Sequence, residues 1–303
     1  MIISASRRTD IPAFYSKWLI NRLRAGYVVS VNPFNRGQVS QISLKAEDVE
    51  VLVFWTKNPA PLLPYLPELD RMGYRYYFQF TLNGYPRLLE PGLPDVGDLI
   101  RTFRQLAEQI GPERVIWRYD PILFTERTDF RYHRKRFAEL LKMLSPNTRR
   151  VVISIADDYK DSLQRLSLLE HQGFARLEQP QSTPEFGDFF IELAELANNA
   201  GLEIYSCAEI YNLQPFNIRP GKCIDDEYIH RVFGIKVTAS KDRSQRLECG
   251  CVTSKDIGAY NSCIHDCIYC YATHNRKTAH QNYSSYQANS PSLGLAPSVA
   301  GEI

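Results

Sequence analysis

Short strand-like runs alternate with amphipathic segments along the first two thirds of the chain. Runs rich in β-branched and aromatic residues predict seven strands, at 2–6, 27–31, 49–55, 74–81, 115–119, 150–155 and 202–206. Apolar residues spaced three and four apart predict helices at 14–25, 98–110, 130–144, 162–172 and 185–200. Because parallel strands need long crossover connections, this alternation predicts an α/β fold with a parallel sheet. We expect a TIM-like parallel β/α barrel, full or partial, whose functional rim is formed by the carboxyl ends of the strands.

The alternation fades near Pro215. We therefore expect the barrel to occupy residues 1–214 and a cysteine-rich, cluster-binding extension to occupy residues 215–280, packed over the barrel mouth, with strand-like pieces at 234–238 and 247–252. Residues 281–303 are rich in Ser, Asn and Pro, which predicts a disordered tail. No GxGxxG or GxxxxGK[ST] string follows a predicted strand, so the dinucleotide and P-loop folds have no support.

Composition narrows the class of protein further. The 303 residues are 44% hydrophobic and 23% charged, as in ordinary globular proteins. No apolar run approaches the ~20 residues of a membrane helix, and the N-terminus lacks a signal-peptide pattern. We expect a cytoplasmic protein without a membrane partner. The net charge is +2, so any recognition of anions must come from local clusters.

Polar and charged side chains follow most of the predicted strands. The carboxyl ends of barrel strands surround one cavity, so we expect these side chains to share a site. The cations among them favour a carboxylate or a phosphate, whereas each residue taken alone could be a solvated loop position or an ion-pair partner. The candidates are Arg7, Arg8, Asp10, Thr56, Lys57, Thr81, Arg118, Asp120 and Glu209.

All the cysteines lie in the last third of the chain. Five of the seven fall within 22 positions, and an odd, clustered set indicates metal or redox chemistry rather than a disulfide framework. The compact run is Cys263-Ile-His-Asp-Cys267-Ile-Tyr-Cys270. One loop with three thiolates at these spacings can hold three corners of a 4Fe–4S cubane, which leaves one iron free for a small molecule. A zinc site is the alternative, with His265, His274, Cys249 or Cys251 as its fourth ligand.

The string CIHDCIYCYA at 263–272 resembles the radical S-adenosylmethionine superfamily, whose hallmark is CxxxCxΦC with an aromatic residue at Φ, here Tyr269. It is most similar to the spore photoproduct lyase branch, and the strings WTKNP at 55–59 and RYDP at 118–121 resemble strand ends of that branch. The chain also resembles an uncharacterised bacterial family that carries the motif near its C-terminal end. The motif follows all the predicted strands rather than the first, and no GGE string is present.

The resemblance implies a radical enzyme and assigns its residues. Cys263, Cys267 and Cys270 would hold a 4Fe–4S cluster, the amine and carboxylate of S-adenosylmethionine would chelate the fourth iron, and Tyr269 would lie near the adenine. The resulting 5′-deoxyadenosyl radical would abstract hydrogen from a substrate. A reductase, or a donor of the flavodoxin or ferredoxin type, would supply the electron. The candidate cofactor contacts are Tyr269, Thr56, Lys57, Thr81 and Arg118, and the candidate substrate contacts are Arg7, Arg8, Asp10, Asp120 and Glu209. The substrate stays open between a small molecule, a peptide and a nucleic acid.

The other cysteines allow two interpretations. Cys223, Cys249 and Cys251 could ligate an auxiliary iron–sulfur cluster or zinc, or could pack as small apolar groups, and no fourth ligand is evident. Cys207, at a strand end, is predicted to be a buried core thiol.

Two functional alternatives accompany the radical enzyme. One is a zinc-binding protein that binds nucleic acid or acts as a hydrolase, using the cysteines and the basic run at 127–136; that run is also typical of a solvated helix face. The other is an electron-transfer or cluster-scaffold protein, which would bind iron without consuming the cofactor.

Overall fold

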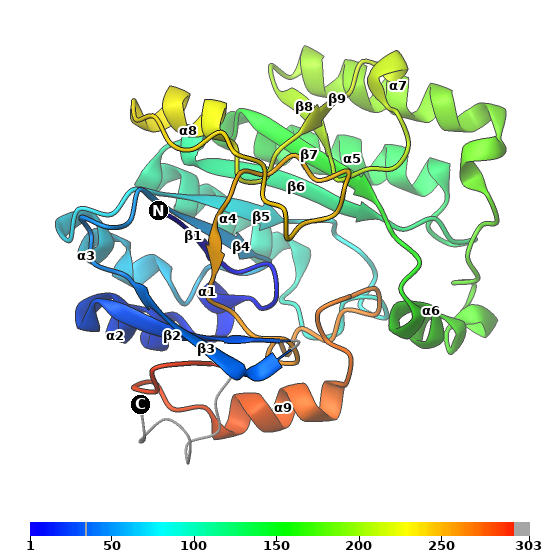
Figure 1. Cartoon of the computed structure of the whole chain (residues 1–303). Coiled ribbons are helices and arrows are strands. Elements are labelled where there is room, and N and C mark those ends of the chain that lie inside the picture. The colour runs from blue at the N-terminus through cyan, green and yellow to red at the C-terminus, as the bar shows by residue number, and fades with distance from the viewer. Residues whose placement is uncertain (34, 294–303) are drawn as a thin grey trace.

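A large parallel sheet organises the protein, for which a computed structural model describes residues 1–33 and 35–293 (Figure 1). Its strands lie in the order β10-β1-β4-β5-β6-β7-β8-β9, and every neighbouring pair is parallel. The bounds are β1 (Ile2–Ala5), β4 (Val51–Thr56), β5 (Tyr76–Thr81), β6 (Val115–Ile122), β7 (Arg150–Ile155), β8 (Glu203–Cys207), β9 (Arg219–Gly221) and β10 (Lys255–Asp256). The α/β class with a parallel sheet is confirmed. Within the described ranges no pairing joins β9 to β10, so closure into a full barrel is not observed.

One predicted strand belongs to a different sheet. The run at 27–31 forms β2 (Tyr27–Asn32), which pairs antiparallel with β3 (Asn35–Ser43) in a separate hairpin. The connection between them is far too short for the crossover that a parallel pair requires, so the two strands pair antiparallel, and the run is not part of the large sheet. The pieces predicted at 234–238 and 247–252 lie in loops, apart from one isolated bridge between Lys241 and Val252.

All five predicted segments contain helix, and the segment at 130–144 is a helix over that whole range, whereas the helices at 66–71, 226–233 and 276–285 were not predicted. The predicted helix at 14–25 is divided at Tyr15, and the one at 162–172 ends early in a 3₁₀ turn. None of the helices in the described ranges is long and apolar enough to cross a membrane. The bounds are α1 (Ile11–Phe14), α2 (Ser16–Ala25), α3 (Leu66–Arg71), α4 (Val96–Ile110), α5 (Phe130–Leu144), α6 (Lys160–Ser167), α7 (Pro184–Asn199), α8 (Asp226–Phe233) and α9 (Arg276–Ser285), with 3₁₀ turns at Leu63–Tyr65, Pro112–Arg114, Ser145–Asn147, Glu170–Gln172, Pro180–Ser182 and Gln214–Phe216.

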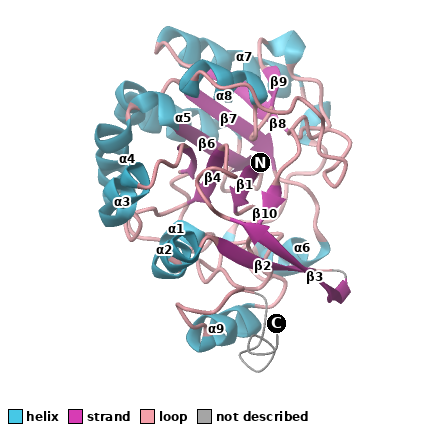
Figure 2. Ribbon diagram, turned by 60° about the vertical axis from the view of Figure 1, so that its left-hand side comes forward, coloured by secondary structure: helices cyan, strands magenta, loops and turns pink. Residues whose placement is uncertain are grey.

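The two faces of the sheet pack against different parts of the chain. Along β4, Leu52 and Phe54 join the large core shared with the helices, whereas Val51 and Val53 join a second core with residues of α8 and the extension. Successive strands that lie side by side place right-handed crossover helices on one face. In Figures 1 and 2 the segment after α8 crosses the opposite face from α4 and α5. The extension therefore supplies the second layer of the fold.

The extension reaches the first strand of the chain through β10. Asp256 of β10 accepts hydrogen bonds from the hydroxyls of Ser4 and Ser6, each at 2.8 Å, and from the backbone N–H of Arg7 at 3.0 Å. These bonds fix the end of β1 and the start of the loop that follows it.

The described part of the segment predicted as a disordered tail, residues 281–293, includes a helix and contacts to the N-terminal region. Residues 281–285 complete α9, and the backbone carbonyl of Ser290 accepts a hydrogen bond of 2.8 Å from Trp18 Nε1 on α2. Tyr283 and Tyr286 both pack edge-on against Tyr15. Burial of these aromatic rings outweighs the polar composition on which the prediction was based. Residues 294–303 lie outside the described residues.

Candidate functional site

The cysteine loop, residues 262–273, lies at the carboxyl end of β1. Nε2 of His265 is 2.9 Å from Oδ2 of Asp10, and the Tyr271 hydroxyl donates to the carbonyl of Arg7 at 2.7 Å. Asp10 also caps α1, since it accepts from the N–H of Ala13 at 3.0 Å. The segment after β1 thus holds a loop that is more than 250 positions away in the sequence.

A second contact fixes the loop against the residues that follow β5. The N–H of Gly92 donates to the His265 carbonyl at 3.0 Å, and the N–H of Ile268 donates to the Leu89 carbonyl at 2.9 Å. A Cβ atom at Gly92 would lie 2.7 Å from the His265 carbonyl oxygen. Only glycine permits this backbone approach without displacing the loop.

Arg165 of α6 supports the loop from a third side. Its Nε donates to the Ile268 carbonyl at 2.8 Å, its Nη1 donates to the Thr273 carbonyl at 3.1 Å, and its Nη2 donates to the carbonyl of Cys270. The sequence analysis did not single out Arg165, because no local pattern reveals partners about 100 positions away.

The three thiols of the loop lie in buried or half-buried positions. Cys267 is buried and Cys263 and Cys270 are half-buried. Burial raises the pKa of Cys263 and Cys267, and the charge of Lys57 opposes this effect at Cys267. Electrostatic repulsion couples Cys263 to both other thiols, but among the described contacts no sulfur–sulfur hydrogen bond joins the three. Metal binding here would release thiol protons.

A buried polar network adjoins the cysteine loop. Nζ of Lys57 donates to Oε1 of Glu90 at 2.8 Å and to the Tyr269 hydroxyl at 2.9 Å, and this hydroxyl donates to the same carboxylate. Burial lowers the pKa of Lys57, but Glu90, Cys267 and Asp120 together raise it by more, so the amine stays charged. Burial and Glu90 together raise the pKa of Tyr269 well above its ordinary value. Glu90 is a site residue that the sequence analysis missed.

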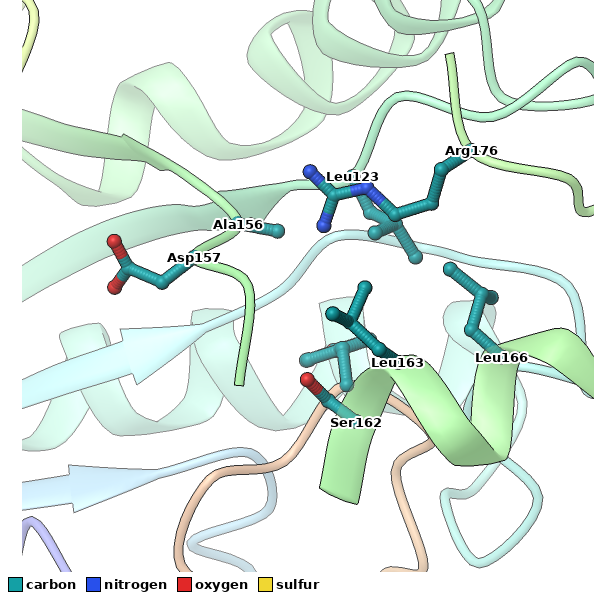
Figure 3. A pocket seen from close by; sticks show the side chains of 8 residues that line it. Leu123, Ala156, Asp157, Ser162, Leu163, Leu166 and Arg176 are labelled. Atoms are coloured by element: carbon teal, nitrogen blue, oxygen red, sulfur yellow. The ribbon is translucent and has the colours of Figure 1, made fainter. Parts of the chain in front are cut away.

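A small hollow is lined in part by Tyr269 (Figure 3). Apolar side chains from the end of β6 and from α6 face each other across it, and Asp157 and Arg176 lie at its margin. Its lining residues are Leu123, Ala156, Asp157, Ser162, Leu163, Leu166, Arg176 and Tyr269. Tyr269 therefore belongs both to the polar network and to the lining of a mainly apolar recess.

Several predicted contact residues are bound to partners within the protein. Arg8 forms an ion pair with Asp256 at 3.0 Å, and Glu209 accepts from the N–H of Ile155 at 2.9 Å. Burial raises the pKa of Glu209. The Thr56 hydroxyl accepts from the N–H of Asn58 at 3.0 Å, and this bond fixes the backbone turn that contains Lys57.

Arg118 and Asp120 lie deeper, on the face of the sheet that the extension covers. Nε of Arg118 donates to Oδ2 of Asp120 at 2.8 Å, and its Nη1 lies 2.8 Å from Sγ of Cys223. Thr81 is the register partner of Arg118 in the neighbouring strand. The predicted contact residues thus divide into a group beside the cysteine loop and a group beside Cys223.

The other four cysteines come together on that same face. Cys223, Cys249 and Cys251 belong to the second core, and Cys207 packs against it. Sγ of Cys207 lies 2.8 Å from Sγ of Cys223, so the predicted core thiol joins the group. In the part of the chain that the structure describes, no group of three or more His, Cys, Asp or Glu side chains is already arranged to hold a metal ion.

The basic run at 127–136 is largely neutralised by acidic neighbours. Nε of Arg134 lies 2.7 Å from Glu192, and its Nη1 contacts Glu185. Arg136 pairs with Glu139 at 3.1 Å. These pairs favour the interpretation of the run as a solvated helix face.

Fold and site together define an α/β protein with a cysteine-bearing loop at the carboxyl ends of a parallel sheet. The chain belongs to the family described as Domain of unknown function (DUF1848), which matches residues 2–272. The matched region contains all seven cysteines and ends two residues after Cys270. No curated protein matches the chain.

Proposed function

We propose that this protein is a radical S-adenosylmethionine enzyme whose site lies at the carboxyl ends of a partial β/α barrel. The observation that carries the proposal is the convergence of one three-cysteine loop on residues from separate strand ends. Asp10 follows β1, Lys57 follows β4 and Glu90 follows β5, and each contacts His265 or Tyr269 of the loop. Carboxyl ends of parallel strands are where such folds place their chemistry.

The residues present suit a 4Fe–4S cluster. The donors are three thiols in one loop, half-buried or buried, and thiolates are the ligands of such clusters. The three sulfurs interact electrostatically without hydrogen-bonding one another, as expected of ligands that bind different irons of one cluster. Lys57 places a positive charge close to Cys267, which favours the thiolate form.

The bound cluster and S-adenosylmethionine would supply one-electron cleavage of a carbon–sulfur bond and the radical that abstracts hydrogen. Cys263, Cys267 and Cys270 would hold the cluster. Tyr269 would lie beside the nucleoside, and the Lys57–Glu90 pair would fix the position of the Tyr269 hydroxyl. The protein's own contribution is to orient these groups and to keep water away from them.

Anaerobic reconstitution with iron and sulfide tests the proposal. We expect a cubane absorption and EPR spectrum, and formation of 5′-deoxyadenosine from S-adenosylmethionine under dithionite. The Cys267→Ala variant should lose both signals. The matched control is His274→Ala, an exposed residue of the same segment that pairs with Asp161 at 2.7 Å; it should keep both.

A zinc site in the same loop is the competing outcome. Nδ1 of His265 is buried without a hydrogen-bond partner, and this residue lies between two of the cysteines. Protein purified without oxygen that contains zinc bound by the loop, and that takes up no iron, would contradict the proposal. Protein that binds iron and sulfide yet never forms 5′-deoxyadenosine would instead be an electron carrier or a scaffold.

A further inference from the structure

Four cysteine thiols from three separate segments meet on the face of the sheet that the extension covers. Cys207 ends β8, Cys223 follows β9, and Cys249 and Cys251 lie in the loop before β10. Sγ of Cys207 and Sγ of Cys223 are 2.8 Å apart, and the Cys251 thiol interacts with those of Cys223 and Cys249. We call these four residues the second cysteine group.

Polar groups are directed at these sulfurs. Nη1 of Arg118 lies 2.8 Å from the Cys223 sulfur, and the N–H of Ile224 donates to the Cys251 sulfur at 3.4 Å. Arg7 interacts electrostatically with Cys251 and Cys223, while its Nη2 is buried without a hydrogen-bond partner. Apolar packing of thiols needs no such donors. A bound metal ion would convert these thiols to thiolates, and the cations and N–H groups beside the sulfurs would then stabilise that form.

We propose that the second cysteine group binds a single divalent metal ion of the zinc class in a closed tetrathiolate site. Four sulfurs at the usual zinc–sulfur distance of about 2.3 Å lie roughly 3.8 Å from one another. Cys207, Cys223, Cys251 and Cys249 interact in that order, each with the next, and the Cys207 and Cys223 sulfurs need to separate by only about 1 Å to reach this spacing. A cubane would require wider spacing, because each thiolate binds a different iron.

Such a site would be structural. Four protein ligands leave no position open for a substrate, and structural zinc sites add their binding free energy to folding. The ligands come from the end of β8 and from both ends of the segment between β9 and β10. The ion would therefore fasten the extension to the sheet before the chain continues to the cysteine loop. This inference is independent of the radical chemistry proposed for that loop.

Metal analysis of the full chain, produced with both zinc and iron in the medium and purified without oxygen, tests the inference. The key sample is the triple variant Cys263→Ser/Cys267→Ser/Cys270→Ser, which lacks the loop site. We expect one zinc per chain in this variant and in the unmodified protein. Adding Cys207→Ser to the triple variant should lower the zinc content at least fivefold. Cobalt(II) supplied in place of zinc should give the absorption bands of a tetrahedral thiolate site in the triple variant.

The outcomes separate the two proposals. A triple variant with no zinc, and with all four remaining thiols open to alkylation or joined in disulfides, overturns the tetrathiolate site. Iron and sulfide retained by the triple variant also overturn it, in favour of a second cluster. Absence of iron from the unmodified protein contradicts the radical enzyme and leaves the zinc result unaffected. If the variant with Cys207→Ser does not accumulate, alkylation of the triple variant is mapped with and without zinc chloride. Protection of all four remaining thiols by zinc supports the site, and no protection overturns it.

Discussion

The cysteine loop and the second cysteine group place the same side chain in two different settings. The loop draws its three thiols from eight consecutive residues, and they approach the polar network of Lys57 and Glu90. The second group gathers four thiols from residues 207–251, and its sulfurs contact one another beneath the extension. The spacing of neighbouring residues therefore brings the cysteines of the loop together, whereas the fold brings those of the second cysteine group together. If both proposals hold, three ligands at the loop would leave one metal position open for chemistry, whereas four ligands at the second group would serve stability.

Lys57→Met, a substitution in the network beside the cysteine loop, should give the largest effect on stability. The substitution leaves the Glu90 carboxylate, which is 5% exposed, buried without its cation. Removing one partner of a buried ion pair reduces the free energy of unfolding by about 3 kcal/mol or more. Urea titration measures this free energy. The control is Lys135→Met, because Lys135 forms an exposed ion pair with Glu139 at 3.9 Å. Its free energy of unfolding should change by less than about 0.5 kcal/mol. Loss of zinc from the Lys57→Met variant would show that the two sites are not independent.

Acidification should reduce the stability of the whole fold, on which both cysteine groups depend. Burial lowers the pKa of His133 from 6.5 to about 4, so between these values the unfolded chain binds more protons than the folded one. Stability rises with pH in that window and falls as the pH drops from about 6.5 to 4, by about 3 kcal/mol for this group.

Urea unfolding at pH 7 and pH 4 measures the effect of His133. The His133→Gln variant should lose about 3 kcal/mol less than the unmodified protein between the two values, whereas the exposed control His171→Gln should behave like the unmodified protein. Equal acid sensitivity of all three proteins would contradict the assignment to His133. The metal contents of the two cysteine groups should therefore be compared above pH 6.5, where protonation of His133 does not reduce the stability of the fold.

Gly92→Ala should give a smaller and purely local effect. Its Cβ atom would lie 2.7 Å from the His265 carbonyl and 2.8 Å from that of Ile264, so the cysteine loop must move. Overpacking of this kind typically reduces stability by about 2 kcal/mol. Hydrogen exchange should show faster exchange at the N–H of Ile268, and iron uptake should fall.

The control for this substitution is Gly97→Ala at the start of α4, where an added Cβ lies no closer than 3.8 Å to its nearest neighbour. It should leave exchange in the loop unchanged. Unchanged exchange in Gly92→Ala as well would mean that the loop is not held by the contact with residues 89–92.

The parts of the fold that could be predicted are those encoded by local periodicity. Strands β1 and β4 to β8, and helix α5, follow from hydrophobic patterns long enough to be unambiguous. Strands β9 and β10, with three and two residues, exist because neighbouring strands pair with them. The hairpin partner of the run at 27–31 could not be deduced either, since strand pairing is a tertiary property.

The same distinction applies to the site. The three cysteines of the loop carry their own spacing, so their motif is visible in the sequence. Glu90, Arg165 and Cys207 have no such signal, because each acquires its role from a partner in a distant segment. Residues of a site that are recruited by long-range contacts need the folded structure to reveal them.

The pairing of β10 with β1 has a consequence for synthesis on the ribosome. Asp256 holds the end of the first strand, and the cysteine loop follows it, so more than four fifths of the chain must leave the ribosome before either can dock. Strand β1 therefore lacks its β10 partner on one edge while the rest of the sheet forms. The candidate site is therefore assembled last during synthesis, and a polypeptide that ends before the cysteine loop would lack the site.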